Sequence, residues 1–269
     1  ETISNFNLLL QKQKKNKNVF LCEKGDNFLS FLAKKLKAEI FEHKNYISGR
    51  YSVLSETGML PAELMGLDEA KFKRFNYLIN NKNFINNLIN NVVSIFSHIK
   101  NGKTNSVILN YDEKSINLFK WYQQLTAESL GKKGKGIFPI VSSMPKDNHS
   151  LLQLYLDGPK NNFYTFFSVR EKNSEKLNNT NLFDKYSILK NKNIFKILDS
   201  QKKATENIFR KKKIPFRSFE IINRTEETMG ELFCFFILET ILLGYLLKLD
   251  PFNQPEVELI KNETKKILI

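Results

Sequence analysis

Short apolar runs alternate with longer stretches of helical period along this chain. The runs are short enough for single strands, and polar or glycine-containing segments bound them. They cover residues 18–22, 38–41, 106–110, 137–142, 162–169 and 216–222. Helices are expected within 1–15, 27–36, 46–65, 69–100 (two helices), 118–130, 149–156, 201–212, 225–249 and 254–269, with surface loops at 180–192. Strands that alternate with helices are typical of βαβ units, so the pattern predicts an α/β fold with parallel sheets.

One predicted helix face ends in a carboxylate. Its members are spaced i, i+3, i+7 and i+10, and they are Leu118, Trp121, Leu125 and Glu128. We expect Glu128 to lie on the buried side near the helix C-terminus, where burial and the helix dipole would raise the pKa of its carboxyl group. A raised pKa suits a general base. The alternative is an exposed glutamate at a helix end.

A glycine- and lysine-rich loop at 131–136 follows Glu128 and leads into the apolar run 137–142. The polar residues 145–148 then bring His149 to the start of the next helix. Taken alone, a histidine at that position is more often a helix N-terminal residue than a catalyst.

The most apolar helix, 225–249, is predicted to be a core helix. Its two apolar runs, 232–238 and 241–247, are interrupted by Glu239 and Thr240, and Glu231 precedes the first run. Neither run reaches the roughly 20 residues that a membrane span requires. We therefore expect it to be buried between domains or subunits, and we expect no membrane partner.

The chain is strongly basic, with a formal net charge of +14 and a pI near 9.5. Such a charge raises nucleic acid or an anionic membrane as partners. The lysines are dispersed, however, and runs such as 211–213 are short. We therefore expect no nucleic-acid partner, although the charge would favour encounter with an anionic small molecule.

Cysteine and histidine are scarce in this chain. Cys22 and Cys234 lie in apolar segments, which predicts buried, reduced thiols in a cytoplasmic protein. The three histidines, His43, His98 and His149, show no metal-ligand spacing, so no metal site is expected. The chain begins at Glu1 without Met and shows no signal-peptide layout, and we read it as part of a longer protein.

Four collinear segments resemble the glucose-6-phosphate isomerase family, also called the phosphoglucose isomerases. They read ISGRYSVLSETGMLPAELMGLD, WYQQLTAESLGKKGKG, KDNHSLLQLYLDGP and ELFCFFILETILLGYLLKLDPFNQPEVELIK, and they span residues 47–261. The resemblance implies two sugar-isomerase-type (SIS), three-layer α/β/α domains with parallel sheets, the first incomplete at its N-terminus. On that reading residues 1–68 end the first domain, 69–250 form the second, and 251–269 form a C-terminal helix that reaches the active site.

The resemblance also implies roles for individual residues. Glu128 in AESLGK matches the family's proton-transfer base, and Arg50 in SGRYS matches the arginine that stabilises the enediolate, although Ser48 replaces the family's first glycine there. His149 matches the ring-opening histidine, which comes from the neighbouring subunit of a homodimer, and Lys261 matches the lysine that assists ring opening. The implied substrate-binding residues are Gly49, Arg50, Gln254 and Glu1.

Together these roles imply an isomerase of glycolysis and gluconeogenesis that interconverts glucose 6-phosphate and fructose 6-phosphate through an enediol. The reaction needs neither a metal nor another cofactor. The family's phosphate-binding loop would precede Glu1, so we expect these residues alone to bind sugar phosphate poorly and to turn over slowly.

Three alternatives stay open from the sequence. The enzyme could also accept mannose 6-phosphate, and no residue decides against this. A non-catalytic sugar-phosphate-binding module could use the same plan, although four retained candidate catalytic residues argue against it. A nucleic-acid-binding protein would need clustered basic residues with aromatic platforms, and the lysines here are dispersed.

Overall fold

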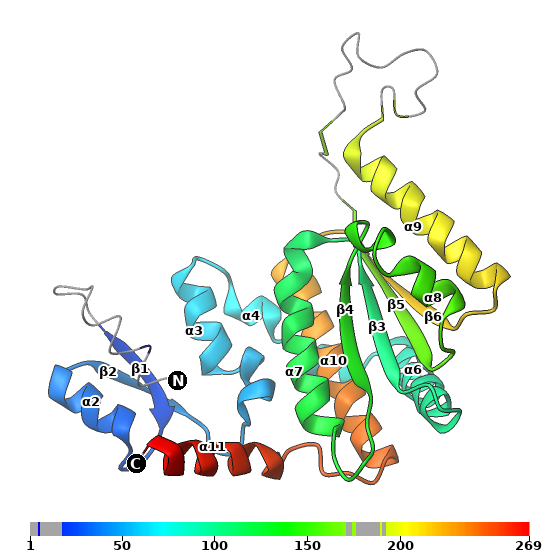
Figure 1. Ribbon diagram of the computed structural model, residues 1–269. Helices are drawn as coiled ribbons and strands as arrows, with labels where there is room; N and C mark the ends of the chain where they lie inside the picture. The colour runs from blue at the N-terminus through cyan, green and yellow to red at the C-terminus, as the bar shows by residue number, and fades with distance from the viewer. Residues whose placement is uncertain (1–4, 6–17, 171–173, 176–188, 190–191, 269) are drawn as a thin grey trace. The chain divides into compact units, whose positions relative to one another are not determined.

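The computed structural model describes residues 5, 18–170, 174–175, 189 and 192–268 (Figure 1). The chain divides into two compact units, Glu1–Glu69 and Ala70–Ile269. The expected helix over 1–15, most of the loops at 180–192, and Glu1 lie outside the described residues.

The first unit contains a two-stranded parallel sheet. Strands β1 (Val19–Glu23) and β2 (Glu39–His43) pair in the register Val19↔Glu39. Helix α2 (Phe28–Leu36) connects them, and Asn27 begins it with a capping box that involves Ser30. The 3₁₀ helix η1 (Gly49–Leu54) and helix α3 (Glu56–Leu64) follow β2. The described part of this unit therefore contains the two parallel strands that the sequence predicted there, fewer than a complete three-layer domain has.

The second unit is built on a four-stranded parallel sheet in the order β4-β3-β5-β6. The strands are β3 (Asn105–Asn110), β4 (Phe138–Ser143), β5 (Asn162–Val169) and β6 (Phe216–Ile221). After β3 the chain moves to one neighbouring strand, β4, and then crosses to the other, β5. The direction of winding therefore reverses between β3 and β5, which is the topological switch point of a doubly wound sheet.

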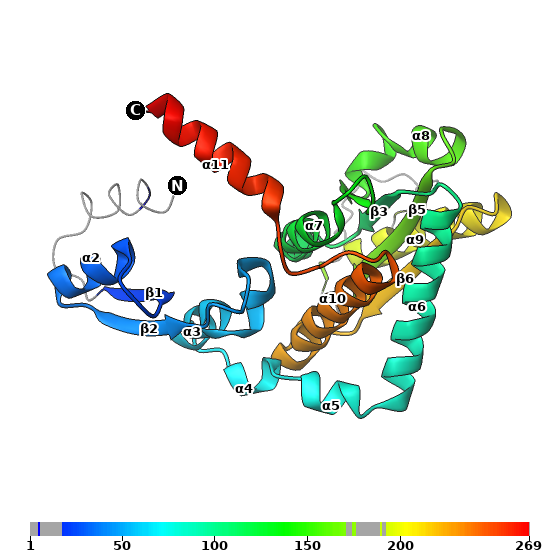
Figure 2. The ribbon, with the colours of Figure 1, turned by 90° about the horizontal axis from the view of Figure 1, so that it is seen from below.

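Helices cover both faces of this sheet. On one face, α8 (Leu152–Asp157) and α9 (Ile194–Lys211) pack through Tyr155 and Phe209 against alternate residues of β3 and β5. On the other, α6 (Lys82–Lys100), α7 (Ile116–Leu130) and α10 (Glu226–Leu246) share a second cluster, and α7 and α10 lie side by side (Figure 2). The second unit is therefore a three-layer α/β/α domain, as expected.

Helix α10 is long and apolar enough to cross a membrane by length and composition alone, with a mean hydropathy of 1.7. Its two apolar runs, taken separately, are each too short to do so, and only the whole helix meets the requirement. Half of this apolar stretch is buried inside the fold, and Glu239 and Thr240 in its middle are each 1% exposed. Helix α10 thus packs as the core helix of the second unit.

All six expected strands are confirmed, with ends that shift by no more than two residues. Three helix expectations were wrong in extent. Residues 69–100 form three helices instead of two, α4 (Glu69–Phe72), α5 (Phe75–Ile79) and α6. The helix expected over 149–156 is the shorter α8, and a 3₁₀ helix, η3 (Lys146–Asn148), precedes it. Helix α9 begins earlier than expected because Asn193 caps it, accepting a hydrogen bond from the Lys196 amide at 2.8 Å.

Candidate active site

Glu128 lies two residues before the end of α7. Leu125 and Leu130 are fully buried on either side of it, whereas the Glu128 side chain itself is half-buried rather than buried as expected. Its Oε1 accepts a hydrogen bond from Gln124 Nε2 at 3.0 Å. The helix therefore anchors Glu128 through its neighbours and leaves the carboxylate within reach of solvent or a ligand.

A buried polar network fixes α7 against the rest of its layer. The Tyr122 hydroxyl donates to Glu239 Oε1 at 3.0 Å, and Glu239 is paired with Arg217 of β6. Burial raises the pKa of Tyr122, which keeps its hydroxyl protonated and able to donate. At the helix surface the Trp121 ring packs edge-on against Phe233 with centroids 5.1 Å apart. These contacts set the rotation of the helix that presents Glu128.

The loop after α7 is fastened to the end of α10. Lys135 Nζ donates to the Leu247 carbonyl at 3.0 Å, and Lys132 Nζ donates to the Asp250 carbonyl. Helix α10 has no basic residue of its own in its last turn, so these two lysines supply the positive charge that its C-terminal end favours. Gly134 and Gly136, with φ of 67° and 114°, allow the tight turn. Neither lysine was given a role from the sequence. The feature that could have indicated one is the position of both lysines in a glycine-rich loop directly after a helix.

This fastening brings two candidate regions together. A cavity of about 580 Å³ lies between the loop that follows Glu128 and the turn that carries Gln254, and Gly131, Asn253 and Pro255 are among its lining residues. Farther along, Lys261 is exposed on α11 (Pro255–Leu268), where its Nζ donates to Glu258 Oε1 at 2.6 Å. The structure thus places the segments around Glu128 and Gln254 at the same end of the sheet, and neither Glu128 nor Lys261 lines the cavity itself.

His149 lies at the opposite end of the sheet from Glu128. It follows η3 just beyond the carboxyl end of β4, and its side chain is exposed. Asp147 organises this turn by accepting hydrogen bonds from Ser142 Oγ at 2.8 Å and from the Ser143 amide at 2.7 Å. Because α7 runs back to the amino end of β4, that strand, about 20 Å long, separates the two residues. Within one chain, Glu128 and His149 are not brought together.

Arg50 and Gly49 belong to the first unit. Arg50 is only 1% exposed, its Nη1 donates to Ser48 Oγ at 3.0 Å, and its guanidinium lies 5.3 Å from the centre of the Tyr51 ring. Ser48, which stands where the resemblance implies a glycine, therefore gives Arg50 a hydrogen-bond partner. Gly49 helps to line a cavity of about 550 Å³ beside β1 and β2. This cavity is a second place in the chain where a ligand could lie.

The remaining expectations concern cysteines and metals. Cys22 and Cys234 are both free and buried, as predicted, and burial raises the pKa of the Cys234 thiol to about 12. Within the described part of the chain, no group of three His, Cys, Asp or Glu side chains is placed to hold a metal ion.

The chain resembles known proteins over nearly its whole length. No protein-family model matches it. The glucose-6-phosphate isomerase of Methanocaldococcus jannaschii is 32% identical over 284 residues, which cover 99% of this chain and 67% of that protein. The glucose-6-phosphate isomerase of Mycoplasmopsis pulmonis is 35% identical over 236 residues, which cover 82% of this chain and 54% of that protein. The chain thus spans between about half and two thirds of the length of these relatives.

A solved structure shares the fold. The crystal structure of a glucose-6-phosphate isomerase from Chlamydia trachomatis superimposes with a TM-score of 0.74 at 14% identity, covering 98% of this chain and 55% of that chain. At that identity the likeness concerns the fold alone.

Proposed function

The chain belongs to the glucose-6-phosphate isomerase family, and from that membership we propose that it forms the larger part of an enzyme that interconverts glucose 6-phosphate and fructose 6-phosphate. The observation that carries the proposal is the 32% identity to the Methanocaldococcus jannaschii isomerase across 99% of this chain. The proposed setting is glycolysis and gluconeogenesis in the cytoplasm.

The proposed reaction moves one proton between two neighbouring carbons of the opened sugar through an enediolate. Glu128 is the proposed base, and its half-buried position at the end of α7 suits a group that must meet a substrate. Arg50 is proposed to stabilise the negative charge on the enediolate oxygen, which a fixed guanidinium can do. Gly49 and Gln254 are the proposed substrate contacts.

Ring opening requires an acid and a base at the sugar ring, and His149 and Lys261 are proposed for this step. The position of His149 at the carboxyl end of β4, opposite Glu128, supports a site that uses Glu128 of one subunit and His149 of another. We therefore propose a homodimer in which each copy supplies His149 to the other. Such an exchange is what a two-fold symmetric interface produces.

The decisive measurement is an isomerase assay on the Glu128→Gln variant. Gln keeps the size and polarity of Glu but cannot accept the proton, so we expect kcat to fall about 10²- to 10⁴-fold while glucose 6-phosphate still binds. The comparison is made both on this chain and on this chain extended upstream to include the expected phosphate-binding loop.

Glu63→Gln is the matched control, because Glu63 also lies in the last turn of a helix, one residue before the end of α3, and is exposed. We expect it to keep full activity. If the protein extended upstream binds glucose 6-phosphate but does not isomerise it, the chain is a sugar-phosphate-binding module and Glu128 is structural. If Glu128→Gln is as active as the parent, another residue is the base.

A further inference from the structure

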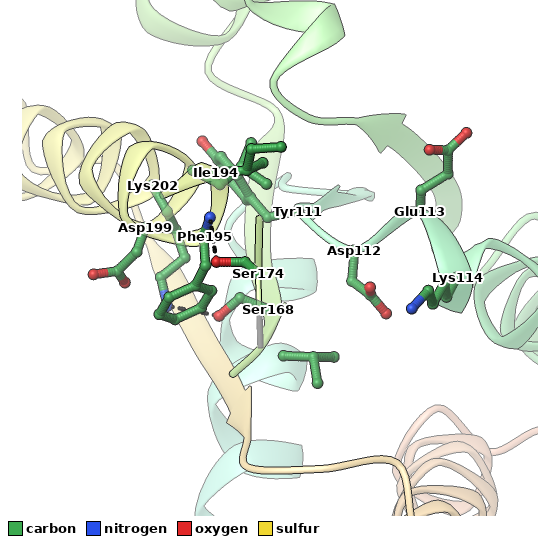
Figure 3. A pocket seen from close by; sticks show the side chains of 12 residues that line it. Tyr111, Asp112, Glu113, Lys114, Ser168, Ser174, Ile194, Phe195, Asp199 and Lys202 are labelled. Atoms are coloured by element: carbon green, nitrogen blue, oxygen red, sulfur yellow. Dashed lines mark hydrogen bonds between the residues drawn. The ribbon is translucent and has the colours of Figure 1, made fainter. Parts of the chain in front are cut away.

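A second, smaller cavity lies at the topological switch point of the second unit. It measures about 210 Å³ and is bordered by the residues that follow β3, the carboxyl end of β5 and the first turns of α9 (Figure 3). Open α/β sheets bind ligands in the crevice at the carboxyl ends of their strands, at this switch point. None of the candidate active-site residues lines this cavity. Glu128 lies at the opposite end of the sheet.

A buried lysine, Lys202 of α9, forms part of the cavity wall. Its side chain is 3% exposed, and its Nζ donates to Ser168 Oγ at 2.8 Å and to Glu220 Oε2 at 3.2 Å. The next carboxylate oxygen, Glu206 Oε1, is 3.9 Å away, which is too far for a hydrogen bond. An ammonium group has three N–H donors. One donor of this buried charge is therefore left without a hydrogen bond among the described residues, which is rare for a buried group.

Two serine hydroxyls lie on the same side of the cavity as Lys202 (Figure 3). Ser168 Oγ accepts the hydrogen bond from Lys202, and Ser174 Oγ accepts one from the Phe195 amide at 3.3 Å. A hydroxyl that accepts can still donate its own proton. Ser168, Ser174 and Lys202 together therefore offer up to three donors to a ligand.

The carboxylates of the cavity are offset by cations. Asp112 is paired with Arg224, and Asp199 accepts a hydrogen bond from Lys203 at 2.6 Å. The third carboxylate, Glu113, is exposed and is followed by Lys114, which also lines the cavity. The positive charges of Arg224, Lys203 and Lys114 therefore largely compensate the three carboxylates, which reduces their repulsion of an anionic ligand.

Helix α9 adds to the preference for an anion. It points its N-terminus at the cavity and has no acidic residue in its first turn, so the positive end of its dipole is not offset there. The apolar side chains Val169, Phe195 and Leu198 complete the wall.

We propose that this cavity binds a small anion whose phosphate or carboxylate group accepts hydrogen bonds from Lys202, Ser168 and Ser174. An apolar remainder of the ligand would lie against Phe195 and Leu198. The site is separate from the proposed isomerase centre, so either proposal can fail without the other.

The test is calorimetric titration of the protein with inorganic phosphate at constant ionic strength, set with chloride. We expect Ser168→Ala and Ser174→Ala each to weaken phosphate binding about tenfold or more, because each removes a hydrogen bond to a charged group. Ser200→Ala is the matched control: Ser200 is an exposed serine of α9 that does not line the cavity. Lys202→Met is not used because it would leave Glu206 and Glu220 without their buried cation and so disturb folding.

Lys261→Ala separates this site from the candidate active site. We expect it and Ser200→Ala to bind phosphate as the parent does. Competition by glucose 6-phosphate or by acetate then distinguishes an organic phosphate from a carboxylate, and both results fit the proposed chemistry. Equal affinity in the parent and both cavity serine variants, loss of binding in Lys261→Ala, or no phosphate binding at all would overturn the proposal.

Discussion

His98 of α6 stacks on Phe163 of β5, with ring centroids 5.6 Å apart and planes inclined by 20°. Burial, together with the nearby charge of Lys103, lowers the pKa of His98 below its ordinary value of 6.5. The folded state therefore disfavours the protonated ring. A histidine with this property links the stability of the second unit to pH.

The direction of this linkage is set by proton binding. Between the lowered folded-state pKa and 6.5 the unfolded chain binds more protons than the folded one, so the free energy of unfolding rises with pH. The contribution of His98 is fully present above 6.5 and is lost as pH falls toward the folded-state pKa.

We expect His98→Phe, which keeps an aromatic ring against Phe163, to flatten the dependence of stability on pH between about pH 5 and 7. Urea unfolding followed by the fluorescence of Trp121, the single tryptophan, measures this. The parent protein, unfolded over the same pH range, is the reference. An unchanged slope in His98→Phe would assign the pH dependence to other groups.

At the scale of elements, one buried ion pair joins the sheet to the three helices that cover one of its faces. Glu239 of α10 is 1% exposed and pairs with Arg217 of β6, while Tyr122 of α7 and Asn91 of α6 also donate to it. Four elements therefore meet at a single carboxylate. Removing one member of a buried pair leaves the other charge uncompensated, whereas replacing both with apolar residues is often close to neutral.

We expect Glu239→Ala to lower the free energy of unfolding by about 3–5 kcal/mol. The double variant Arg217→Met/Glu239→Leu should lose less than this single variant, although Tyr122 would still lack its acceptor. Urea denaturation of both proteins tests the expectation. If the double variant is instead less stable than Glu239→Ala, the ion pair itself adds to the free energy of unfolding, and the cost of Glu239→Ala does not come only from leaving Arg217 unpaired.

At the scale of the whole molecule, the proposed exchange of His149 between subunits predicts that two inactive variants restore activity when they are combined in one dimer. Glu128→Gln and His149→Ala should each be nearly inactive alone. If each site combines Glu128 of one copy with His149 of the other, a mixed dimer keeps one intact site. If the two variants associate at random, half of the dimers contain one copy of each. Because one of the two sites in each mixed dimer is intact, roughly a quarter of the parent activity should return.

The experiment mixes the two variants after unfolding and refolding them together, and then assays isomerase activity. Each variant refolded alone is the control. No recovery in a mixture shown to contain mixed dimers would mean that both residues act within one chain.

The sequence by itself determined the class of fold and most of its elements. Apolar runs of strand length are a local signal, and the six strands lie within two residues of their expected ends. The helix expected over 27–36 and the helix carrying Glu128 were readable because their apolar positions repeat with a helical period. The early start of α9 was missed, because Asn193 sits in an Asn- and Lys-rich stretch whose composition is that of a loop.

Tertiary structure alone decided which of these residues meet. Lys132 and Lys135 donate hydrogen bonds to carbonyl groups at the end of α10, and Lys202 is buried at the switch point. By residue type alone, nothing distinguishes these three residues from the many other dispersed lysines. The separation of Glu128 from His149 likewise arises because α7 runs back along β4. Sequence patterns record the periodicity of a segment, whereas charge pairing and the placement of a site depend on contacts between segments far apart in the chain, which only packing creates.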